Sequence, residues 1–206
     1  MSIRAKFART AAALALATTG IAGAVATAQP AAADPVIAID WNLDANVTIA
    51  KLGISQSVTG GEFVGGADLG NGTINGNLVL PSSSINVNIL GINLADVGFA
   101  VTPIGATSGT FDLASSTVSI TSSFDIKIPF LRPLGLQRVN LVGNRCQTAE
   151  PITLTMSGPI DLANPSSFTG EFTIPKFKNC GLLTFAINLL IPGGGNTFSA
   201  TASPKA

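Results

Sequence analysis

The fold is decided by the stretch at residues 37–49, IAIDWNLDANVTI, in which apolar and polar side chains alternate. Its odd positions carry Ile, Ile, Trp, Leu, Ala, Val and Ile, whereas its even positions carry Ala, Asp, Asn, Asp, Asn and Thr. This period of two indicates a β-strand with one dry and one wet face, and not a helix. At about 3.3 Å per residue the strand would be roughly 43 Å long, about twice the usual length. We therefore expect it to bend, to carry a bulge or to serve two sheets.

The same alternation returns along the rest of the chain. It is clearest at residues 118–128, and shorter versions occur at 74–80, 85–89, 97–101, 152–156, 168–174 and 198–202. Turn formers such as Asn71-Gly72 and Pro192-Gly193 separate these runs at intervals of about ten residues. The pattern predicts an all-β fold, either an antiparallel β-sandwich or a curved or closed β-barrel, of about 9–12 strands.

One apolar segment fits two kinds of secondary structure. Residues 182–191, LLTFAINLLI, follow Gly181 and end before Pro192. Their pattern suits either a fully buried strand or a short helix, because periodicity does not separate the two over so few residues. The sequence thus allows one short helix near 182–191 in the all-β domain.

An approximate repeat recurs three times, at residues 66–81, 109–129 and 158–175. Each copy has a Gly, then Asp-Leu, a polar turn, a strand and a closing Pro, and the recurrent acids are Asp68, Asp112 and Asp161. We expect each copy to be a β-hairpin whose Asp binds turn backbone and whose Leu enters the core. A shared cation site is the less favoured alternative, since one acid per hairpin supplies too few oxygens for Ca²⁺ unless the turns converge.

Residues 1–33 have the organisation of a cleavable secretory signal peptide. Three basic residues in the first ten are followed by an uncharged, Ala-rich stretch and by Ala31, Ala32 and Ala33, which suit signal peptidase. Cleavage after Ala28 and a retained membrane anchor are the alternatives. The sequence predicts a secreted or extracytoplasmic protein with a single β domain at 34–206 and no transmembrane helix after cleavage.

The two cysteines, Cys146 and Cys180, both lie in the predicted mature domain. An even number of cysteines in an exported chain indicates a disulfide. Closing a loop of about 35 residues would stabilise the fold by about 3 to 4 kcal/mol on the chain-entropy model. A redox pair or a metal site has no support, because the chain has no His and no C-x-x-C motif.

The sequence offers no set of residues for catalysis. The absence of His excludes Ser-His-Asp and Cys-His devices. The segment Gly53-Ile54-Ser55-Gln56-Ser57 lacks the second Gly of a nucleophile elbow, and the 11 acids are too dispersed to nominate a pair for glycoside cleavage. We therefore expect no enzyme, no cofactor and no metal ion.

Charge is distributed unevenly along the chain. Removal of residues 1–33 leaves 8 basic and 11 acidic residues, and the excess of acid lies in residues 34–125, where Lys51 is the one base. The second half carries six bases that could contact an anionic surface such as lipid head groups or cell-wall polymers: Lys127, Arg132, Arg138, Arg145, Lys176 and Lys178. Nucleic acid is a poor candidate, given the low total charge and the lack of stacking platforms in a chain with no Tyr and a single Trp. A domain with one basic and one acidic end, and no ligand, is the plain alternative.

Only 11% of the residues are charged and 46% are hydrophobic, which is unusual for a secreted domain. Three kinds of protein could account for so many apolar residues: a curved sheet that encloses an apolar ligand, a membrane pore with its apolar faces outward, or a structural envelope component without a ligand. The lack of Tyr disfavours the pore. The leading hypothesis is a non-enzymatic envelope protein that binds apolar molecules or envelope lipids. The candidate wall of the cavity, for which a packed core is the alternative role, is Trp41, Leu43, Val118, Ile120 and Phe124.

Three parts of the chain carry a resemblance: NLVGNRCQTAEPITLTMSGPIDL at 140–162, FTGEFTIPKFKNCGLLTFAINLLIPGGGNTFSATASP at 168–204, and KLG at 51–53. They resemble an uncharacterised group of small, secreted, β-rich proteins of actinobacteria with one Cys pair. The resemblance implies an exported β protein with one disulfide. It implies no catalytic residue and no ligand.

Overall fold

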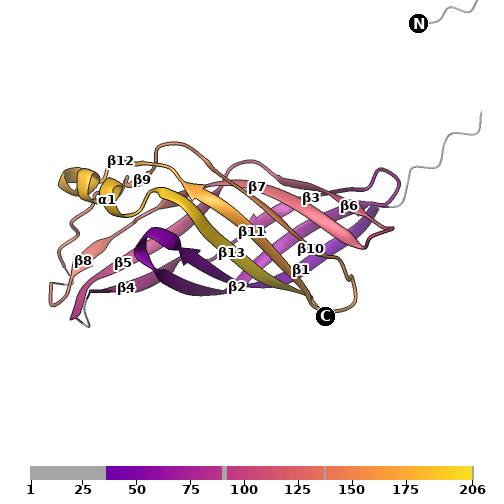
Figure 1. Ribbon diagram of the computed structural model, residues 1–206, viewed down its shortest axis with the longest axis horizontal. Coiled ribbons are helices and arrows are strands. Elements are labelled where there is room, and N and C mark those ends of the chain that lie inside the picture. Colours follow the sequence, from indigo (N-terminus) through magenta and orange to yellow (C-terminus); the bar gives the residue numbers. More distant parts are fainter. Residues whose placement is uncertain (1–35, 90–91, 137, 206) are drawn as a thin grey trace, which may run out of the picture. The chain divides into compact units, whose positions relative to one another are not determined.

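The computed structural model describes residues 36–89, 92–136 and 138–205, and these residues form a closed antiparallel β-barrel with further strands outside it (Figure 1). Residues 34–206 make up one compact unit. The predicted signal peptide at 1–33 lies outside the described residues. Of the predicted all-β alternatives, the structure therefore has the closed barrel and not the sandwich.

Eight strands form the ring of the barrel. In the order in which they pair, they are β1 (Val36–Ile49), β2 (Ile54–Asp68), β3 (Thr73–Val79), β6 (Thr107–Asp112), β7 (Thr117–Lys127), β10 (Ile152–Pro159), β11 (Ser166–Ile174) and β13 (Gly193–Pro204). Each strand runs antiparallel to its neighbours, and β13 pairs with β1 to complete the ring. Closure leaves few free strand edges in the wall, which is how a barrel avoids edge-to-edge aggregation.

Further elements extend the molecule at one end of the ring. They are the strands β4 (Ser83–Ile89), β5 (Ile92–Pro103), β8 (Leu131–Pro133), β9 (Gln147–Thr148) and β12 (Phe177–Lys178), the 3-10 turns η1 (Ala50–Leu52) and η2 (Gly181–Leu183), and the helix α1 (Thr184–Leu190). We call this end the open end; the opposite end, with the β2–β3, β6–β7 and β10–β11 turns, is the turn end (Figure 1). Of the 13 strands described, three have only two or three residues, and the segment that fitted both strand and helix is α1.

The first strand has the predicted length, and of the three expected adjustments it carries a bulge. Its even-numbered residues from Asp40 to Asn46 are exposed, whereas Ile39, Trp41, Leu43 and Ala45 are buried. Between Leu43 and Ala45 its register with β2 shifts. Thr59 and Gly60 of β2 stand there opposite a single residue of β1, and Gly60 takes the positive φ of 76° that such a bulge favours. The bulge bends the two longest strands so that they can follow the barrel wall.

Side chains fill the interior of the barrel. The indole of Trp41 lies between the rings of Phe63 and Phe168, with centroid distances of 6.2 and 6.1 Å. A cavity of only about 20 Å³ remains among these rings and their neighbours. Eight strands enclose a space just wide enough for side chains to fill, so this part of the barrel is a packed core and not a channel.

The three Asp-Leu hairpins form turns in which the carboxylate accepts hydrogen bonds, as predicted. Asp68 accepts from the backbone N–H groups of Gly70 and Asn71 at 3.0 and 3.1 Å. Asp112 and Asp161 each accept from the backbone N–H two residues further on, at 2.8 and 2.9 Å. Each carboxylate also accepts from a side chain of its own turn. The three acids thus bind their own turns instead of converging on a shared cation.

The leucines of these hairpins behave differently from one another. Leu69 is partly buried against the core, as expected. The expectation is wrong for Leu113 and Leu162, whose side chains are 65% and 44% exposed. Both lie in the turn beyond the last paired residues of their strands, where no opposite wall remains to cover them.

The disulfide predicted between Cys146 and Cys180 is present, with an S–S distance of 2.02 Å. Both cysteines are buried. Cys146 precedes β9, and Cys180 lies between β12 and η2. The bond therefore ties α1 and its flanking turn to the sheet at the open end.

Loss of the disulfide should destabilise the open end. The double substitution Cys146→Ser and Cys180→Ser is expected to lower the free energy of unfolding by about 3 to 4 kcal/mol, because it frees a loop of about 35 residues in the unfolded chain. Urea unfolding of the wild-type and variant proteins measures this difference. In the wild type, alkylation without reductant should label neither cysteine, and labelling of both would refute the bond.

The turn aspartates should make stability depend on pH in the acid range. Hydrogen bonds lower the pKa of all three carboxyls, chiefly those from the Asn71 side chain to Asp68, from the Ala114 backbone to Asp112 and from the Asn164 side chain to Asp161. A carboxyl with a lowered pKa in the folded state stabilises that state above the unfolded pKa. This contribution is lost as the pH falls through the folded pKa.

We expect the urea midpoint of Asp161→Ala to lie below that of the wild type at pH 7, and the two midpoints to converge at about pH 2, where both states are protonated. The exposed residue Asp44 of β1 gives the control Asp44→Ala, which removes no turn hydrogen bond. An Asp161→Ala difference that persists unchanged at low pH would contradict the account.

Candidate functional site

The barrel wall has a gap at the open end, between β2 and β4. The first part of β2, Ile54–Val58, pairs with β1, whereas pairing with β3 begins only at Glu62. After β3 the chain leaves the wall, and β4 pairs with β5 alone among the described residues. The β5 strand in turn pairs with the end of β7 and so continues the wall beyond β6. The facing edges of β2 and β4 are therefore not joined by ladder hydrogen bonds.

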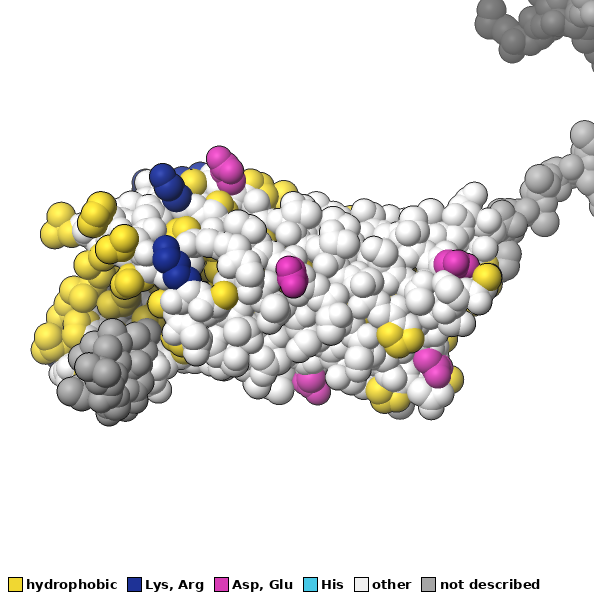
Figure 2. All heavy atoms as spheres, in the orientation of Figure 1, with side chains coloured by type: hydrophobic (Ala, Val, Ile, Leu, Met, Phe, Trp, Pro, Cys, Tyr) yellow, Lys and Arg dark blue, Asp and Glu magenta, His cyan; other side chains and the backbone are white. Residues whose placement is uncertain are grey.

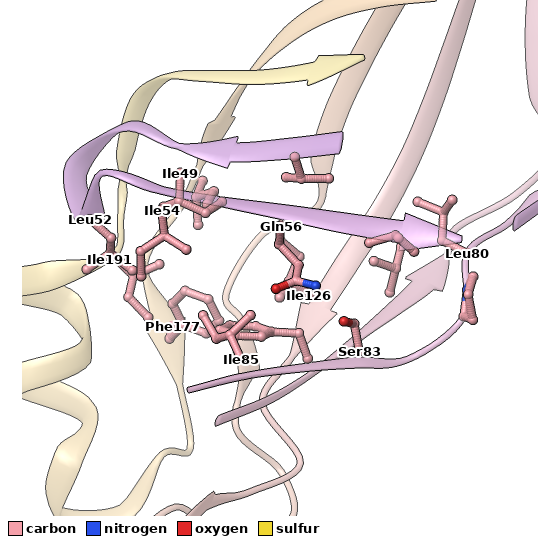
Figure 3. A pocket seen from close by; sticks show the side chains of 16 residues that line it. Ile49, Leu52, Ile54, Gln56, Leu80, Ser83, Ile85, Ile126, Phe177 and Ile191 are labelled. Carbon is pink, nitrogen blue, oxygen red and sulfur yellow. The ribbon is translucent and has the colours of Figure 1, made fainter. Parts of the chain in front are cut away.

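An apolar cavity of about 110 Å³ lies behind this gap (Figure 3). Of its 16 lining residues, 14 are apolar: Val47, Ile49, Leu52, Ile54, Val58, Leu80, Pro81, Ile85, Phe99, Val101, Ile126, Ile174, Phe177 and Ile191. They come from both sides of the gap and from the wall behind it. Many of them are only partly buried, unlike the side chains of the packed barrel core.

The strand β2 shows how the sequence builds one side of this cavity. Ile54, Gln56 and Val58 are half-buried and line the cavity, whereas Ser55 and Ser57 between them are exposed. On the other side of the gap, Ser83 and Ile85 of β4 also line it (Figure 3). The two-residue period thus presents one row of side chains from each free edge to the same space.

A second apolar cavity of about 160 Å³ adjoins the first. The two share Leu52, Ile85, Phe99 and Ile191, so they form one continuous apolar region. The second cavity is lined by η2 and α1, through Leu183, Ala186, Ile187 and Leu190, and by the strands β5 and β8. The helix therefore forms one wall of the site.

The chemistry of the site is almost wholly apolar. Gln56 and Ser83 supply the two polar side chains around the first cavity, and all residues around the second are apolar. The Gln56 amide donates a hydrogen bond to the Ser57 carbonyl at 2.8 Å. Of the lining residues that the structure assigns to the two cavities, none is charged. The site can hold hydrocarbon, and it offers no acid, base or nucleophile pair for catalysis.

A cation lies beside the site, in the turn η1. Lys51 precedes Leu52, which lines both cavities, and its Nζ donates to the Pro192 carbonyl at 3.2 Å. Pro192 in turn follows Ile191, another residue shared by the cavities. Lys51 is exposed. An anionic end of an apolar molecule could therefore reach a cation without the burial of a charge.

The residues predicted as a cavity wall lie in the packed interior of the barrel. Trp41, Leu43 and Ile120 line the cavity of about 20 Å³, and Val118 and Phe124 are buried in the same core. The larger cavities are lined by other residues. On β1 they are Val47 and Ile49, which continue the predicted apolar face beyond the bulge. The alternation identified this face, but only the strand pairing shows where the core ends and the cavity begins.

The bases predicted to contact an anionic surface gather at the open end. Lys127 and Lys178 both pair with Gln147 in register, so the three side chains lie side by side across β7, β9 and β12. The Arg132 guanidinium lies 4.2 Å from the centroid of the Phe130 ring. The other three predicted bases, Arg138, Arg145 and Lys176, are exposed in the segments around β9 and β12.

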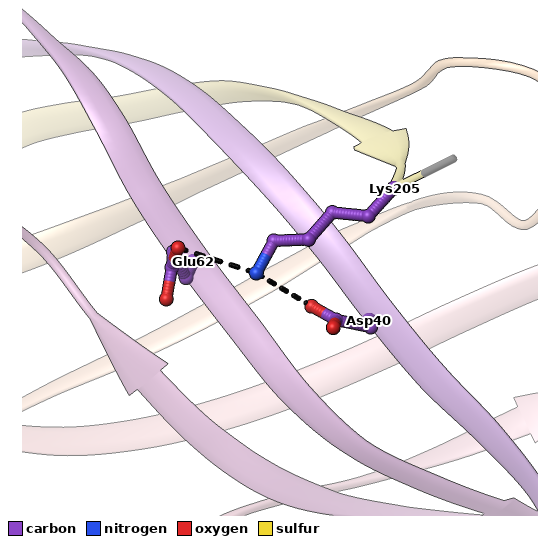
Figure 4. A network of polar contacts seen from close by, with 3 residues as sticks. All are labelled: Asp40, Glu62 and Lys205. Carbon is purple, nitrogen blue, oxygen red and sulfur yellow. Dashed lines mark ion pairs between the residues drawn. The ribbon is translucent and has the colours of Figure 1, made fainter.

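The C-terminal base lies away from this group. Lys205 follows β13 near the turn end, and its Nζ is 2.8 Å from Asp40 and 3.2 Å from Glu62 (Figure 4). Hydrogen bonds to Asp40 and then to Glu62 raise the pKa of Lys205. The turn end also carries the three hairpin aspartates. Most of the bases thus lie toward the open end, whereas the three hairpin aspartates lie at the turn end.

Two features are absent from the described residues. No helix among them is long and apolar enough to cross a membrane. No group of three or more Cys, Asp and Glu side chains among them is placed to hold a metal ion.

Comparison of the chain with protein-family models, with curated proteins and with solved structures gives no match.

Proposed function

We propose that this protein is a non-enzymatic, extracytoplasmic binding protein that holds an apolar molecule, such as an acyl chain, between β2 and β4. The observation that carries the proposal is the continuous apolar region behind two unpaired strand edges. Unpaired strand edges and apolar cavities are unfavourable in a domain that only has to form a packed core. Around Trp41, by contrast, side chains fill the interior of the barrel and leave a cavity of only about 20 Å³.

The shape of the site favours a slim ligand. Cavities of about 110 and 160 Å³ are smaller than the several hundred Å³ usual for drug-sized ligands. A flexible hydrocarbon chain could enter where a broad ring system could not. The edges of β2 and β4 can also move apart at low cost, because no ladder hydrogen bond between them has to break.

The polar end of such a ligand would stay at the surface. A carboxylate is costly to bury without a partner, and the residues around both cavities offer it no cation. Lys51 precedes the shared residue Leu52, and its Nζ donates to the carbonyl of Pro192, which follows the shared residue Ile191. We place the anionic end of the ligand at η1 and its hydrocarbon tail toward α1.

The orientation of side chains in the barrel supports binding over the pore hypothesis. A membrane pore needs apolar side chains on the outside of the barrel and polar side chains on the inside. In β1 the arrangement is the reverse, since Trp41 and Leu43 are buried inside while Asn42 and Asp44 are exposed. The barrel interior is also filled.

The extracytoplasmic location in the proposal has two supports. Buried disulfides persist in oxidising compartments and are rare in the cytosol, and Cys146 and Cys180 form one. The sequence pattern of residues 1–33 and the resemblance to secreted actinobacterial proteins point the same way. A structural envelope component without a ligand is the competing proposal.

Gln56 offers a direct test, because its side chain lines the cavity from the edge of β2 without belonging to the packed core. We expect Gln56→Trp to fill the entrance and to weaken the binding of cis-parinaric acid about tenfold or more, the loss of about 1.4 kcal/mol of binding free energy. Fluorescence titration measures the affinity. Ser57→Trp is the matched control, because it adds the same ring to the exposed face of the same strand and should leave the affinity unchanged.

Saturable binding by the wild type at one site per chain is the first requirement. If the wild-type protein takes up no cis-parinaric acid, or if Gln56→Trp and Ser57→Trp bind it equally well, the cavity is not the binding site. The absence of any uptake would favour the structural component.

A further inference from the structure

The helix α1 exposes apolar side chains to water, whereas its polar side chains face the protein. Leu182 of the preceding turn is 99% exposed and Phe185 is 80% exposed, and Leu189 lies exposed on the next turn. The polar side chains of α1 instead bind the protein. The Thr184 hydroxyl donates to the Gly181 carbonyl, and the Asn188 amide both accepts from and donates to the backbone of Phe177. Surface helices normally show the opposite distribution.

A second segment adds apolar side chains to the same end. Exposed apolar residues follow β8 at Leu134, Leu136, Val139 and Leu141. Leu131 of β8 lines the second cavity together with Leu183 and Leu190, so β8 and α1 lie close together. We call the exposed set the tip surface: Leu134, Leu136, Val139, Leu141, Leu182, Phe185, Leu189 and Leu190. Figure 2 shows hydrophobic side chains gathered at this end of the molecule, whereas elsewhere on the visible face they are scattered.

Bases lie at the same end of the molecule as the tip surface. Lys51 is in η1, Lys127 ends β7, Arg132 is in β8 and Lys178 is in β12, while Arg138, Arg145 and Lys176 lie in the connecting segments. The acids nearby are fewer: Asp96 lies opposite Arg132 in the ladder, Asp125 accepts from the Thr148 hydroxyl, and Glu150 follows β9. Bases therefore outnumber acids in this part of the molecule. Basic side chains are visible beside the apolar group in Figure 2.

We propose that the tip surface docks the protein on an anionic lipid bilayer. Apolar side chains that protrude from a helix and a loop, with Lys and Arg beside them, match the two layers of such a surface: the side chains enter the acyl boundary and the bases contact the head groups. The turn end would face away from the membrane. The elements η2 and α1 line the second cavity and also carry part of the tip surface, so docking would bring the site next to a source of acyl chains.

Vesicle binding tests this proposal with the disulfide-bonded protein. Wild-type protein should co-sediment with vesicles of equal parts phosphatidylglycerol and phosphatidylcholine, and should bind pure phosphatidylcholine at least about tenfold more weakly. Salt at about 0.5 M should weaken binding to the anionic vesicles, because it screens the head-group charge.

Two variants separate the apolar and the electrostatic contributions. Leu182→Asp with Phe185→Asp should lower the partition coefficient by about a hundredfold, since both side chains would enter the membrane. Arg145→Gln with Lys176→Gln should lower it about tenfold on anionic vesicles only. Leu113→Asp is the control, because the Leu113 side chain is also exposed, at 65%, but lies at the turn end. It should bind like the wild type.

The proposal is overturned if the wild type does not bind anionic vesicles. It is also overturned if the double variant Leu182→Asp with Phe185→Asp binds them as well as Leu113→Asp does. Self-association that this double variant abolishes, in a protein that does not bind vesicles, would instead assign the tip surface to a second copy of the chain. Binding of cis-parinaric acid without vesicles is measured in parallel. Neither Leu182 nor Phe185 lines a cavity, so failure of docking and failure of ligand binding give different results.

Discussion

The pairing of β7 with β10 is the interaction on which the rest of the structure depends. Eight residue pairs, from Thr117 with Pro159 to Phe124 with Ile152, close the sheet into a ring. Closure brings the apolar faces of all eight strands together and so produces the packed core around Trp41. The closed ring extends over only part of the long strands. Beyond the ring, β2 no longer pairs with β3, and β5 replaces β6 as the neighbour of β7. The strand β4 pairs with β5 and not with β2, so the wall between β2 and β4 stays open.

The sequence predicted the features that depend on local order. Alternation at 37–49 predicted the long strand, with a bulge as one of three ways to accommodate its length. The Asp-Leu repeats predicted turns in which a carboxylate binds backbone, and the cysteine count predicted the disulfide. It did not predict where the cavities lie, because Val47 and Trp41 occupy equivalent positions of one alternating strand. They differ only in what stands opposite, and long-range pairing decides that. The sequence did not predict the exposure of Leu113 and Leu162 either, because it also depends on what stands opposite these side chains.

The two ends of the barrel divide the chemistry of the protein between them. At the turn end, carboxylates are satisfied within their own turns and Lys205 joins two exposed acids, so these charges contribute little beyond local stability. At the open end, the apolar cavities, the outward-facing leucines of α1 and most of the bases occur together. Such a concentration of apolar surface needs a partner. Our proposals supply two: an acyl chain inside and an anionic bilayer outside.

The central claim is that hydrocarbon occupies the space between β2 and β4. A crystal structure of the protein with a fatty acid brominated near the middle of its chain tests this claim most directly, because bromine is located by its anomalous signal. The account predicts a bromine peak among Ile54, Ile85 and Ile126, with the carboxylate toward Lys51. A peak elsewhere, or a cavity that stays empty at saturating ligand, would contradict it.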